Sequence, residues 1–184
     1  LPKDFTESWL IPEGMIGVQI GSGSTPFTVT AAVPVRLAIT PASPSLAKGT
    51  SVNLAATATF SDDSVRPVTA DASWSSSAVN VVTVSDASGS KGRSTGVNEG
   101  STTVRAVYQG VSGSVVVTVT PATVDSISVT PPTSSIPNGT ATQLTATAVR
   151  SDGTTQPVST AVWTSSSDAV ATVDGSGKVT GRSV

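Results

Sequence analysis

The sequence predicts an all-β fold of tandem Greek-key β-sandwiches, and three observations favour this class. Ser, Thr and Val are plentiful, and 16 Gly and 12 Pro interrupt the chain often, which suits short strands and tight turns better than long helices. Apolar and polar residues alternate over several segments. The chain also repeats itself after about 90 residues, which is the length of a whole sandwich domain.

The repeat is clear over a long stretch. The segment "LAITPASPSLAKGTSVNLAATATFSDD" (37–63) aligns with "ISVTPPTSSIPNGTATQLTATAVRSDG" (127–153). After a slip of one residue, Trp74 aligns with Trp163. A period of this length is too long for one turn of a solenoid, so we expect each copy to be a separate domain.

The alternation predicts which side chains of the first copy face the core. Strands with one buried and one solvated face show a period of two. The expected inward positions are Leu37, Ile39, Val52, Leu54, Ala56, Ala58, Phe60, Val104, Ala106, Tyr108, Val115, Val117 and Val119. Turn signals separate these segments at Lys48-Gly49, Asp62-Asp63, Ser88-Gly89, Glu99-Gly100 and Gln109-Gly110. About seven short strands with this spacing are typical of a two-sheet sandwich.

The two repeated tryptophans are expected to be core residues. Aromatic residues make up only 4% of the chain, so the core consists mostly of Val, Ala, Leu and Ile. Trp74 is expected to fill the space between the two sheets, and Trp163 to be buried at the equivalent place. The other reading is that Trp74 stacks on a ligand.

Several motifs in a fixed order carry a resemblance to a known family. They are "ISVTP" (127–131), "NGTATQLTATA" (138–148), "VWTSSSDAVATVD" (162–174) and "GKVTG" (177–181). Residues 35–184 resemble the bacterial immunoglobulin-like group 2 family. The first copy is a looser match, because it lacks the acid found at Asp168 and has "GRSTG" (92–96) in place of "GKVTG". The resemblance implies tandem immunoglobulin-like sandwiches without a common active site, as found in phage virion proteins and bacterial surface adhesins.

The repeat sets the expected domain limits. Residues 1–34 form an N-terminal segment, 35–120 the first immunoglobulin-like domain, 121–125 a linker and 126–184 the second domain. The linker is short and contains Pro121, so we expect the domains to lie end to end with limited bending. Residues 27–41 align with 117–131. The N-terminal segment is therefore expected to be the end of a preceding domain or an arm that docks on a neighbour.

The second domain is expected to lack its last two strands. In the first domain, "NEGSTTVRAVYQGVSGSVVVTVT" (98–120) supplies these strands, and no segment up to Val184 matches it. A sandwich without them exposes unpaired strand edges and half of its core. We therefore expect either that the natural chain continues or that another chain completes the sheet.

Composition argues against most kinds of chemistry. The chain has no His and no Cys, which excludes a serine–histidine triad, thiolate metal sites and disulfides. The Gly-rich "GSGS" (21–24) is not followed by the Lys-Ser/Thr of a phosphate-binding loop. A net charge of −2 gives no reason to expect nucleic acid, and no stretch approaches a membrane-spanning length. The sequence predicts no enzyme, no cofactor, and no catalytic, cofactor-binding or metal-binding residues.

Three short features can be interpreted as chemical sites, and each also has a simpler structural explanation. Asp62-Asp63 and Asp152-Gly153 occupy matching turns and could offer oxygens to calcium, although Asp and Gly are favoured in turns anyway. Asp168 is expected to accept hydrogen bonds from nearby backbone amides. Asn138-Gly139-Thr140 satisfies a glycosylation sequon, but a hairpin turn explains it more simply.

Two functions agree with these observations. The first is a non-enzymatic structural or display module of a phage virion, in a tail, neck or capsid protein that aids weak attachment to the host. The alternative is a stalk or binding repeat of a bacterial cell-surface adhesin. Residues 1–26 depart from the repeat, which favours the virion over a uniform stalk. Both readings place the chain outside the cell, on a virion or bacterial surface. Expected partners are other protein subunits and host-surface glycans bound weakly by many copies.

Overall fold

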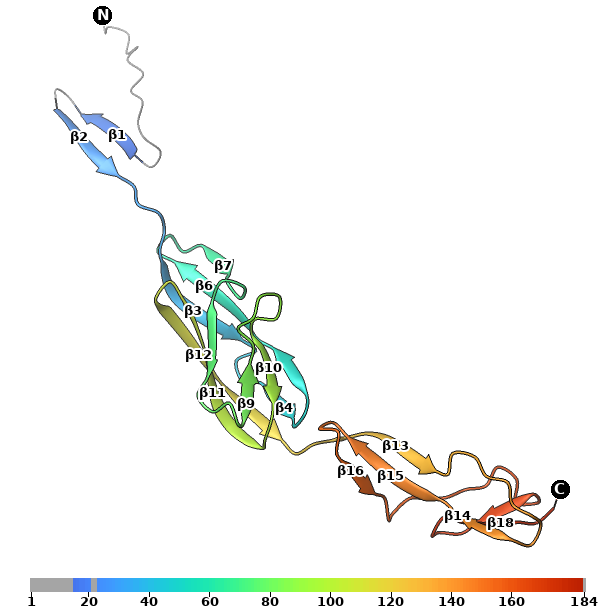
Figure 1. The fold of residues 1–184 in the computed structure, drawn as a ribbon. Helices are drawn as coiled ribbons and strands as arrows, with labels where there is room; N and C mark the ends of the chain where they lie inside the picture. Colours follow the sequence, from blue (N-terminus) through green and yellow to red (C-terminus); the bar gives the residue numbers. More distant parts are fainter. Residues whose placement is uncertain (1–14, 21–22, 184) are drawn as a thin grey trace, which may run out of the picture.

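The described part of the chain folds as strands and turns, which confirms the all-β class. The computed structural model describes residues 15–20 and 23–183, and these form no helix. An N-terminal hairpin comes first, followed by two strand-rich units arranged end to end (Figure 1). We call residues 35–120 the first unit and residues 126–184 the second unit.

The N-terminal hairpin consists of two antiparallel strands. Strand β1 (Met15–Ile20) pairs with β2 (Gly23–Thr28), from Met15 opposite Thr28 to Ile20 opposite Gly23. A short connection leads from β2 to the first strand of the first unit (Figure 1).

One layer of the first unit is built around a long strand that is interrupted at Leu54. Its second half, β6 (Ala55–Phe60), pairs with β3 (Pro34–Thr40) and β7 (Val65–Pro67). Its first half, β5 (Ser51–Asn53), pairs with β10 (Arg93–Gly96), which also pairs with β9 (Val82–Val84). The two three-stranded sheets are therefore joined through β5 and β6.

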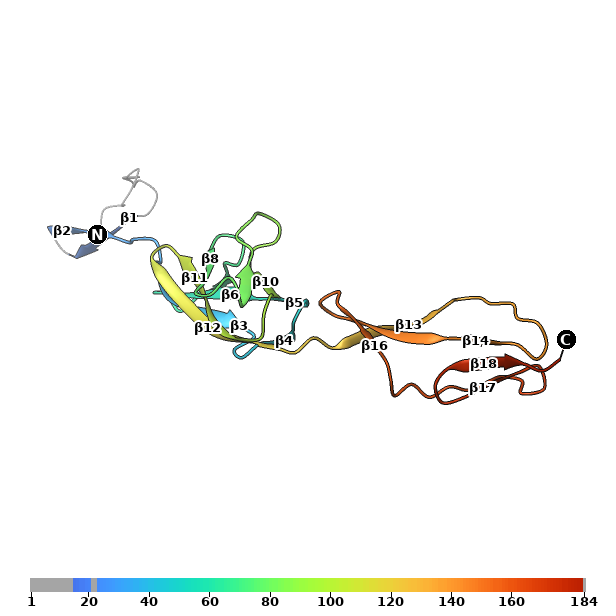
Figure 2. The same ribbon diagram turned by 60° about the horizontal axis from the view of Figure 1, so that its bottom comes forward.

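The other layer is a four-stranded sheet. Its order is β4 (Ser45–Ala47), β12 (Val111–Thr120), β11 (Gly100–Tyr108) and β8 (Ser73–Ser76). Strands β11 and β12 form a long hairpin that closes the unit, and β4 runs parallel to β12 at one edge. Figure 2 shows β12 lying across β3, so that the two layers enclose a core between them.

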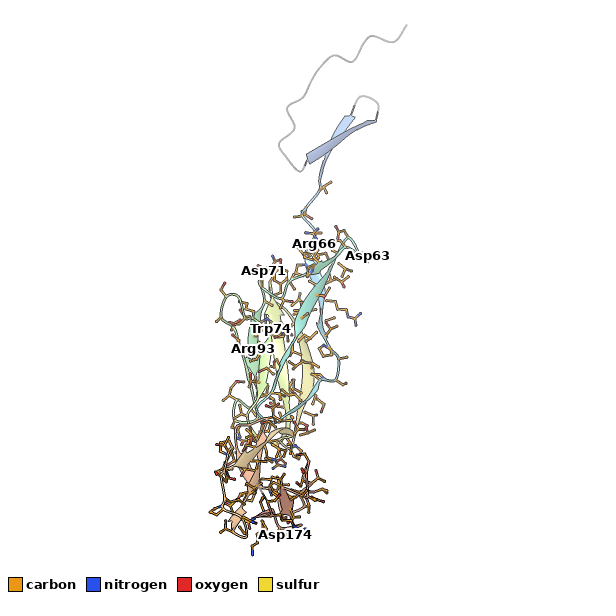
Figure 3. All side chains as sticks on the ribbon, turned by 90° about the vertical axis from the view of Figure 1, so that its right-hand side faces the viewer. Asp63, Arg66, Asp71, Trp74, Arg93 and Asp174 are labelled. Atoms are coloured by element: carbon orange, nitrogen blue, oxygen red, sulfur yellow. The ribbon has the colours of Figure 1, made fainter. Side chains whose placement is uncertain are left out.

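The core lies between these layers and matches the predicted inward set closely. Trp74 is 5% exposed and donates its indole N–H to the carbonyl oxygen of Thr69 at 3.1 Å. Figure 3 shows it inside the first unit. The other buried apolar residues are Leu37, Ile39, Leu46, Leu54, Ala56, Ala58, Phe60, Val68, Ala72, Val82, Val104, Ala106, Val115, Val117 and Val119. Val52 and Tyr108, both predicted to face inward, pack against this core while partly exposed.

The second unit repeats one layer of the first. Strands β13 (Val124–Thr130), β15 (Thr145–Arg150) and β16 (Thr155–Pro157) correspond to β3, β6 and β7. Strands β14 (Ala141–Gln143), β18 (Lys178–Gly181) and β17 (Ala171–Val173) correspond to β5, β10 and β9. Within the described part of the chain, the sheet formed by β4, β12, β11 and β8 has no counterpart in this unit (Figures 1 and 2).

The side chains that this layer would cover are exposed. Ile127 is 53% exposed, whereas its equivalent Leu37 is 7% exposed. Val129 is 40% exposed, against 7% for its equivalent Ile39. Trp163 is only partly buried and lies outside any strand, so the prediction that it would be as buried as Trp74 was wrong. The physical reason is that β8, the strand of Trp74, pairs with β11, and the second unit holds no such partner in its described residues.

Candidate functional site: the junction between the two units

The two units meet through two turns. The turn between β4 and β5 in the first unit, at Lys48 and Gly49, faces the turn between β15 and β16 in the second, at Ser151 and Asp152. The Ser151 hydroxyl donates a hydrogen bond to the carbonyl oxygen of Lys48 at 2.7 Å. The Lys48 ammonium lies 3.3 Å from the Asp152 carboxylate. We call these four residues the junction.

The Lys48-Gly49 turn is held by its own unit. The Lys48 amide donates to the carbonyl oxygen of Thr120, the last residue of β12, at 2.9 Å. The Gly49 amide donates to the carbonyl oxygen of Gly96 at 2.9 Å. Gly49 has a φ of 85°, which favours glycine. A Cβ on Gly49 would also overlap the Ser151 carbonyl oxygen and the Asp152 Cα, so glycine permits the close approach of the two units.

The Ser151-Asp152 turn is equally well fixed, and it also holds the linker. The Ser151 amide donates to the carbonyl oxygen of Thr123 at 2.8 Å, and the Thr123 amide donates to the Ser151 hydroxyl at 3.1 Å. One carboxylate oxygen of Asp152 accepts from the Thr154 amide at 3.1 Å and from the Thr154 hydroxyl at 2.6 Å. Ser151 therefore connects the second unit, the linker and the first unit.

The electrostatics of the junction favour an ionised Asp152. Hydrogen bonds from the Thr154 hydroxyl and amide, and then from the Lys48 ammonium, lower the pKa of Asp152 from 3.8 to about 2, against an opposing effect of desolvation. The Asp152 side chain is 9% exposed and that of Lys48 is 34% exposed. The ion pair is thus partly shielded from solvent, which makes it less sensitive to salt than a fully exposed pair.

We expect the junction to be pH-dependent on the acid side. Because folding lowers the pKa of Asp152, its stabilising contribution is complete well above pH 3.8 and is lost as pH falls towards about 2. NMR titration of the Asp152 carboxylate should show this pKa. Thr154→Ala should raise the pKa, because the Thr154 hydroxyl is the largest single cause, and Lys48→Met should raise it as well. A pKa that stays near 2 in Thr154→Ala would contradict this assignment.

The matching turn of the first unit has the same local structure. One Asp62 carboxylate oxygen accepts from the Ser64 amide at 3.0 Å and from the Ser64 hydroxyl at 2.6 Å. These bonds lower the pKa of Asp62. The following residue has positive φ in both turns, 61° at Asp63 and 79° at Gly153.

The hydrogen bonds to Asp62 and Asp152 account for an aspartate in each turn, so no calcium ion is needed to explain them. The second carboxylate oxygen of Asp152 faces a lysine ammonium, which competes with a cation. Residues 15–20 and 23–183 contain no group of three His, Cys, Asp or Glu side chains that could hold a metal ion. The absence of metal-binding residues stays a prediction.

Two other sequence candidates lie in turns. Asp168 is exposed, and Ser165 makes the local hydrogen bonds instead, accepting from the Ser167 amide at 3.2 Å and donating to the carbonyl oxygen of Ala171 at 2.7 Å. The prediction for Asp168 was therefore wrong. Asn138-Gly139-Thr140 does form a tight turn, in which Thr140 donates its hydroxyl to the carbonyl oxygen of Pro137 at 2.7 Å.

No local pattern predicts a role for Asp86, although its carboxylate does bind a backbone amide. Its carboxylate accepts from the Trp74 amide at 3.0 Å and lies 3.3 Å from the Lys91 ammonium. The hydrogen bond from the Trp74 amide is the main cause that lowers the pKa of Asp86. Asp86 therefore helps to fix the strand that carries the core tryptophan.

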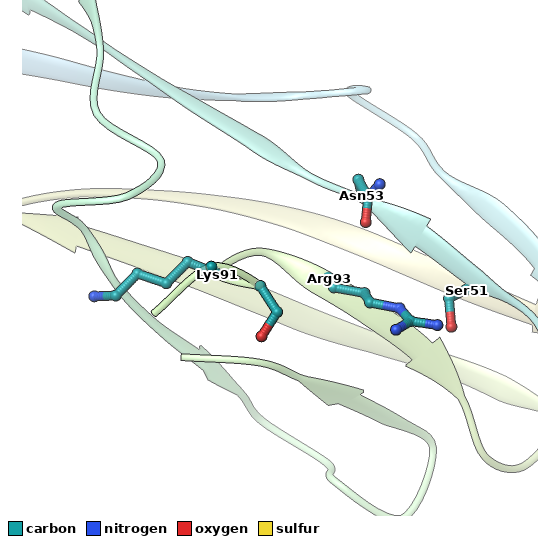
Figure 4. Close-up of a pocket in the computed structure, with 6 residues that line it drawn as sticks. Ser51, Asn53, Lys91 and Arg93 are labelled. Atoms are coloured by element: carbon teal, nitrogen blue, oxygen red, sulfur yellow. The ribbon is translucent and has the colours of Figure 1, made fainter. Parts of the chain in front are cut away.

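A surface hollow of about 540 Å³ in the first unit is lined by Ser51, Asn53, Gly89, Ser90, Lys91 and Arg93. Its two cationic side chains do not converge, because their charged ends point in opposite directions (Figure 4). The Lys91 ammonium already binds the carbonyl oxygen of Ala72 at 2.8 Å. The hollow thus has no focused charge with which to hold an anion.

None of the residues that the structure describes forms a helix with the length and apolar character needed to cross a membrane.

The chain is similar to a curated protein and to several solved structures. The chain is 36% identical over 174 residues to Ice-binding protein 1 of Shewanella frigidimarina (strain NCIMB 400). The alignment covers 93% of this chain but only 19% of that protein. Among solved structures, the chain is similar to domains 4 and 5 of the S-layer protein SbsC, with 24% identity and a TM-score of 0.40, covering 57% of this chain and 63% of that one. It is also similar to domains 1–6 of SbsC, with 20% identity and a TM-score of 0.45, covering 90% of this chain and 24% of that one.

The family model for the bacterial Ig-like domain (group 2) matches the chain twice, over residues 35–119 and 123–184. These matches cover most of the chain and confirm the resemblance seen in the motifs. The chain belongs to the bacterial Ig-like domain (group 2) family and carries two adjacent matches to it.

Proposed function

We propose that this chain is a non-enzymatic spacer in a bacterial surface protein, in which Ig-like units follow one another and hold another part of the protein away from the cell. The observation that carries the proposal is the junction. A linker alone would leave the units free to swing, whereas Ser151 and Asp152 fasten the second unit to the first. A fixed angle between units lets a row of domains act as a stiff rod.

The matches favour a bacterial surface protein over a phage virion. The relative in Shewanella is a bacterial protein, and the family is described as bacterial. The phage reading and its tail, neck or capsid location receive no support from these matches. We retain the hypothesis that the chain lies outside the cell, on the bacterial surface, with other proteins as partners. Weak contact with glycans through the hydroxyl-rich loops stays a prediction.

The match to an ice-binding protein raises the question of whether this chain itself binds ice. The alignment covers 19% of Ice-binding protein 1, so most of that protein lies outside the aligned part. We therefore expect the 184-residue chain on its own to show no thermal hysteresis and no enrichment in a growing ice crystal. Measurable ice binding by this chain would contradict the spacer role and assign it the contact surface instead.

Replacing Gly49 with alanine tests the junction directly. The new Cβ would overlap backbone atoms of Ser151 and Asp152, which cannot move as a flexible side chain can. We expect Gly49→Ala to separate the turns and to broaden the distribution of distances between the units. Double electron–electron resonance between spin labels at the exposed positions Ser101 and Thr155 measures this distribution.

Gly139→Ala is the matched control. Gly139 occupies the equivalent turn of the second unit with a φ of 76°, so alanine meets similar backbone strain, but a Cβ there has no neighbour within 4 Å. The control should leave the distance distribution as narrow as in the wild type. Equal broadening in both variants, or in neither, would overturn the junction as the feature that fixes the units.

A further inference from the structure

The hollow in the first unit is bordered by a loop that is longer than its counterpart in the second unit. Gly92 and Gly177 are equivalent positions, because an added Cβ at either one would meet the tryptophan ring of its own unit. Seven residues, Ser85 to Lys91, lie between β9 and Gly92, whereas three, Asp174 to Ser176, lie between β17 and Gly177. Insertions of this kind, present in one repeat and not in the next, often lie on a binding face.

In the second unit, a glutamine ties the short loop to the neighbouring strand. The Gln143 side-chain amide donates to the carbonyl oxygen of Ser176 at 2.7 Å and to that of Leu144 at 2.8 Å. Asn53 stands at this position in the first unit, and its side chain is one methylene shorter. No hydrogen bond ties the Asn53 side chain to any of the residues that the structure describes. The hollow of about 540 Å³ therefore lies between the strand of Asn53 and the longer loop.

The longer loop is fixed by its own contacts. The hydroxyl groups of Ser85 and Ser90 are hydrogen-bonded to each other at 2.7 Å. The Gly92 amide donates to the carbonyl oxygen of Ser85 at 2.9 Å, and the Lys91 ammonium donates to the carbonyl oxygen of Ala72 at 2.8 Å. The wall of the hollow is thus formed before any ligand arrives, which lowers the entropic cost of binding.

The hollow offers hydrogen-bonding groups without a focused charge. Asn53 and Arg93 lie opposite each other on β5 and β10. The Arg93 side chain extends towards Ser51, whereas that of Lys91 points the other way (Figure 4). Arg93 makes no ion pair within the described chain. None of the six lining residues is aromatic or aliphatic. These groups suit a polar ligand with many hydroxyl groups, and they suit neither an apolar ligand nor a multiply charged anion.

We infer that this hollow binds a neutral saccharide, with Asn53 and Arg93 as its main contacts. The guanidinium can donate to two neighbouring sugar oxygens, while the amide of Asn53 both donates to and accepts from hydroxyl groups. The volume lies within the range of about 300–1,000 Å³ that small-molecule sites occupy. Since no aromatic ring lines the hollow, each site binds weakly, and firm attachment to a polysaccharide needs many copies. The site is separate from the junction, so it does not depend on the spacer role.

A titration of the full 184-residue chain, followed by the amide signals in NMR spectra, tests the inference. The probes are the neutral tetrasaccharides of glucose, mannose and N-acetylglucosamine, with inorganic phosphate as the anionic comparison. We expect at least one saccharide to cause saturable shifts in the amide signals of residues 51–53 and 89–93, with a millimolar dissociation constant, and phosphate to cause none. The absence of saturable shifts with all three saccharides would overturn the inference. Saturable shifts of the same signals with phosphate would overturn it too, because the hollow would then be an anion site.

Two substitutions locate the binding. Arg93→Gln and Asn53→Ala should each weaken it by about tenfold, as expected for the loss of strong hydrogen bonds. Both side chains are exposed, so these changes leave the first unit folded. Lys178→Gln is the matched control, because Lys178 lies opposite Gln143 as Arg93 lies opposite Asn53, and this variant should bind like the wild type. Unchanged affinity in both first-unit variants would place the saccharide elsewhere and would refute the assignment.

Discussion

Replacing Trp74 with alanine is expected to lower the free energy of unfolding of the first unit by about 3–5 kcal/mol, the usual loss for a large aromatic residue removed from a core. Trp74 is 5% exposed and lies between the two layers. Its indole ring packs against Gly92, where an added Cβ would come within 3.2 Å of the ring. Trp74 lies on β8, which pairs with β11, and this pairing limits how far the backbone can move into the cavity.

Trp163→Ala is the matched control for this prediction. Trp163 packs against Gly177 in the same manner, with 2.9 Å between an added Cβ and the indole ring, but its other side lacks the covering layer. We expect its replacement to cost roughly 1 kcal/mol, as for an average substitution. Urea unfolding followed by amide NMR signals of each unit separates the two effects. Equal losses in the two variants would contradict the difference in burial.

The alternation of apolar residues predicted the first unit well because its strands each have one buried face. Leu37, Ile39, Val104 and Val117 are buried as the period of two requires. The pattern failed for Trp163, where the local sequence resembles that around Trp74 but the pairing strand is not among the described residues. Burial of a strand residue depends on the opposite layer, and a local pattern cannot report whether that layer is present.

The junction could not be predicted for a related reason. Lys48 and Asp152 both lie in turns, where polar residues are expected, and no local pattern singles them out. Their contact depends on how the linker orients one unit against the other. One signal was available in the alignment of the repeats, since Lys48 stands where the second copy has Asn138. A charge present in only one copy of a turn is a reason to look for a partner in the neighbouring copy.

The second large effect concerns the stability of the second unit. In limited proteolysis of the 184-residue chain at low concentration, we expect cuts from about residue 125 onward while residues 35–120 remain protected. All seven residues of β13 are exposed, and its apolar side chains have no second layer to pack against. Such a unit opens at a low free energy, and proteases cut the open form.

Appending a copy of residues 98–120 after Val184 should protect the second unit. These 23 residues hold β11 and β12, whose buried faces supply five of the sixteen buried apolar residues in the core of the first unit. The appended hairpin can cover Ile127 and Val129 and pair with the segment around Trp163, as β11 pairs with β8. A scrambled extension of equal length is the control and should leave the cuts unchanged, because it lacks the alternation that buries one face. If the 184-residue chain already resists proteolysis as a monomer through residue 180, the second unit is stable without a covering hairpin, and the expected protection by the appended residues is wrong.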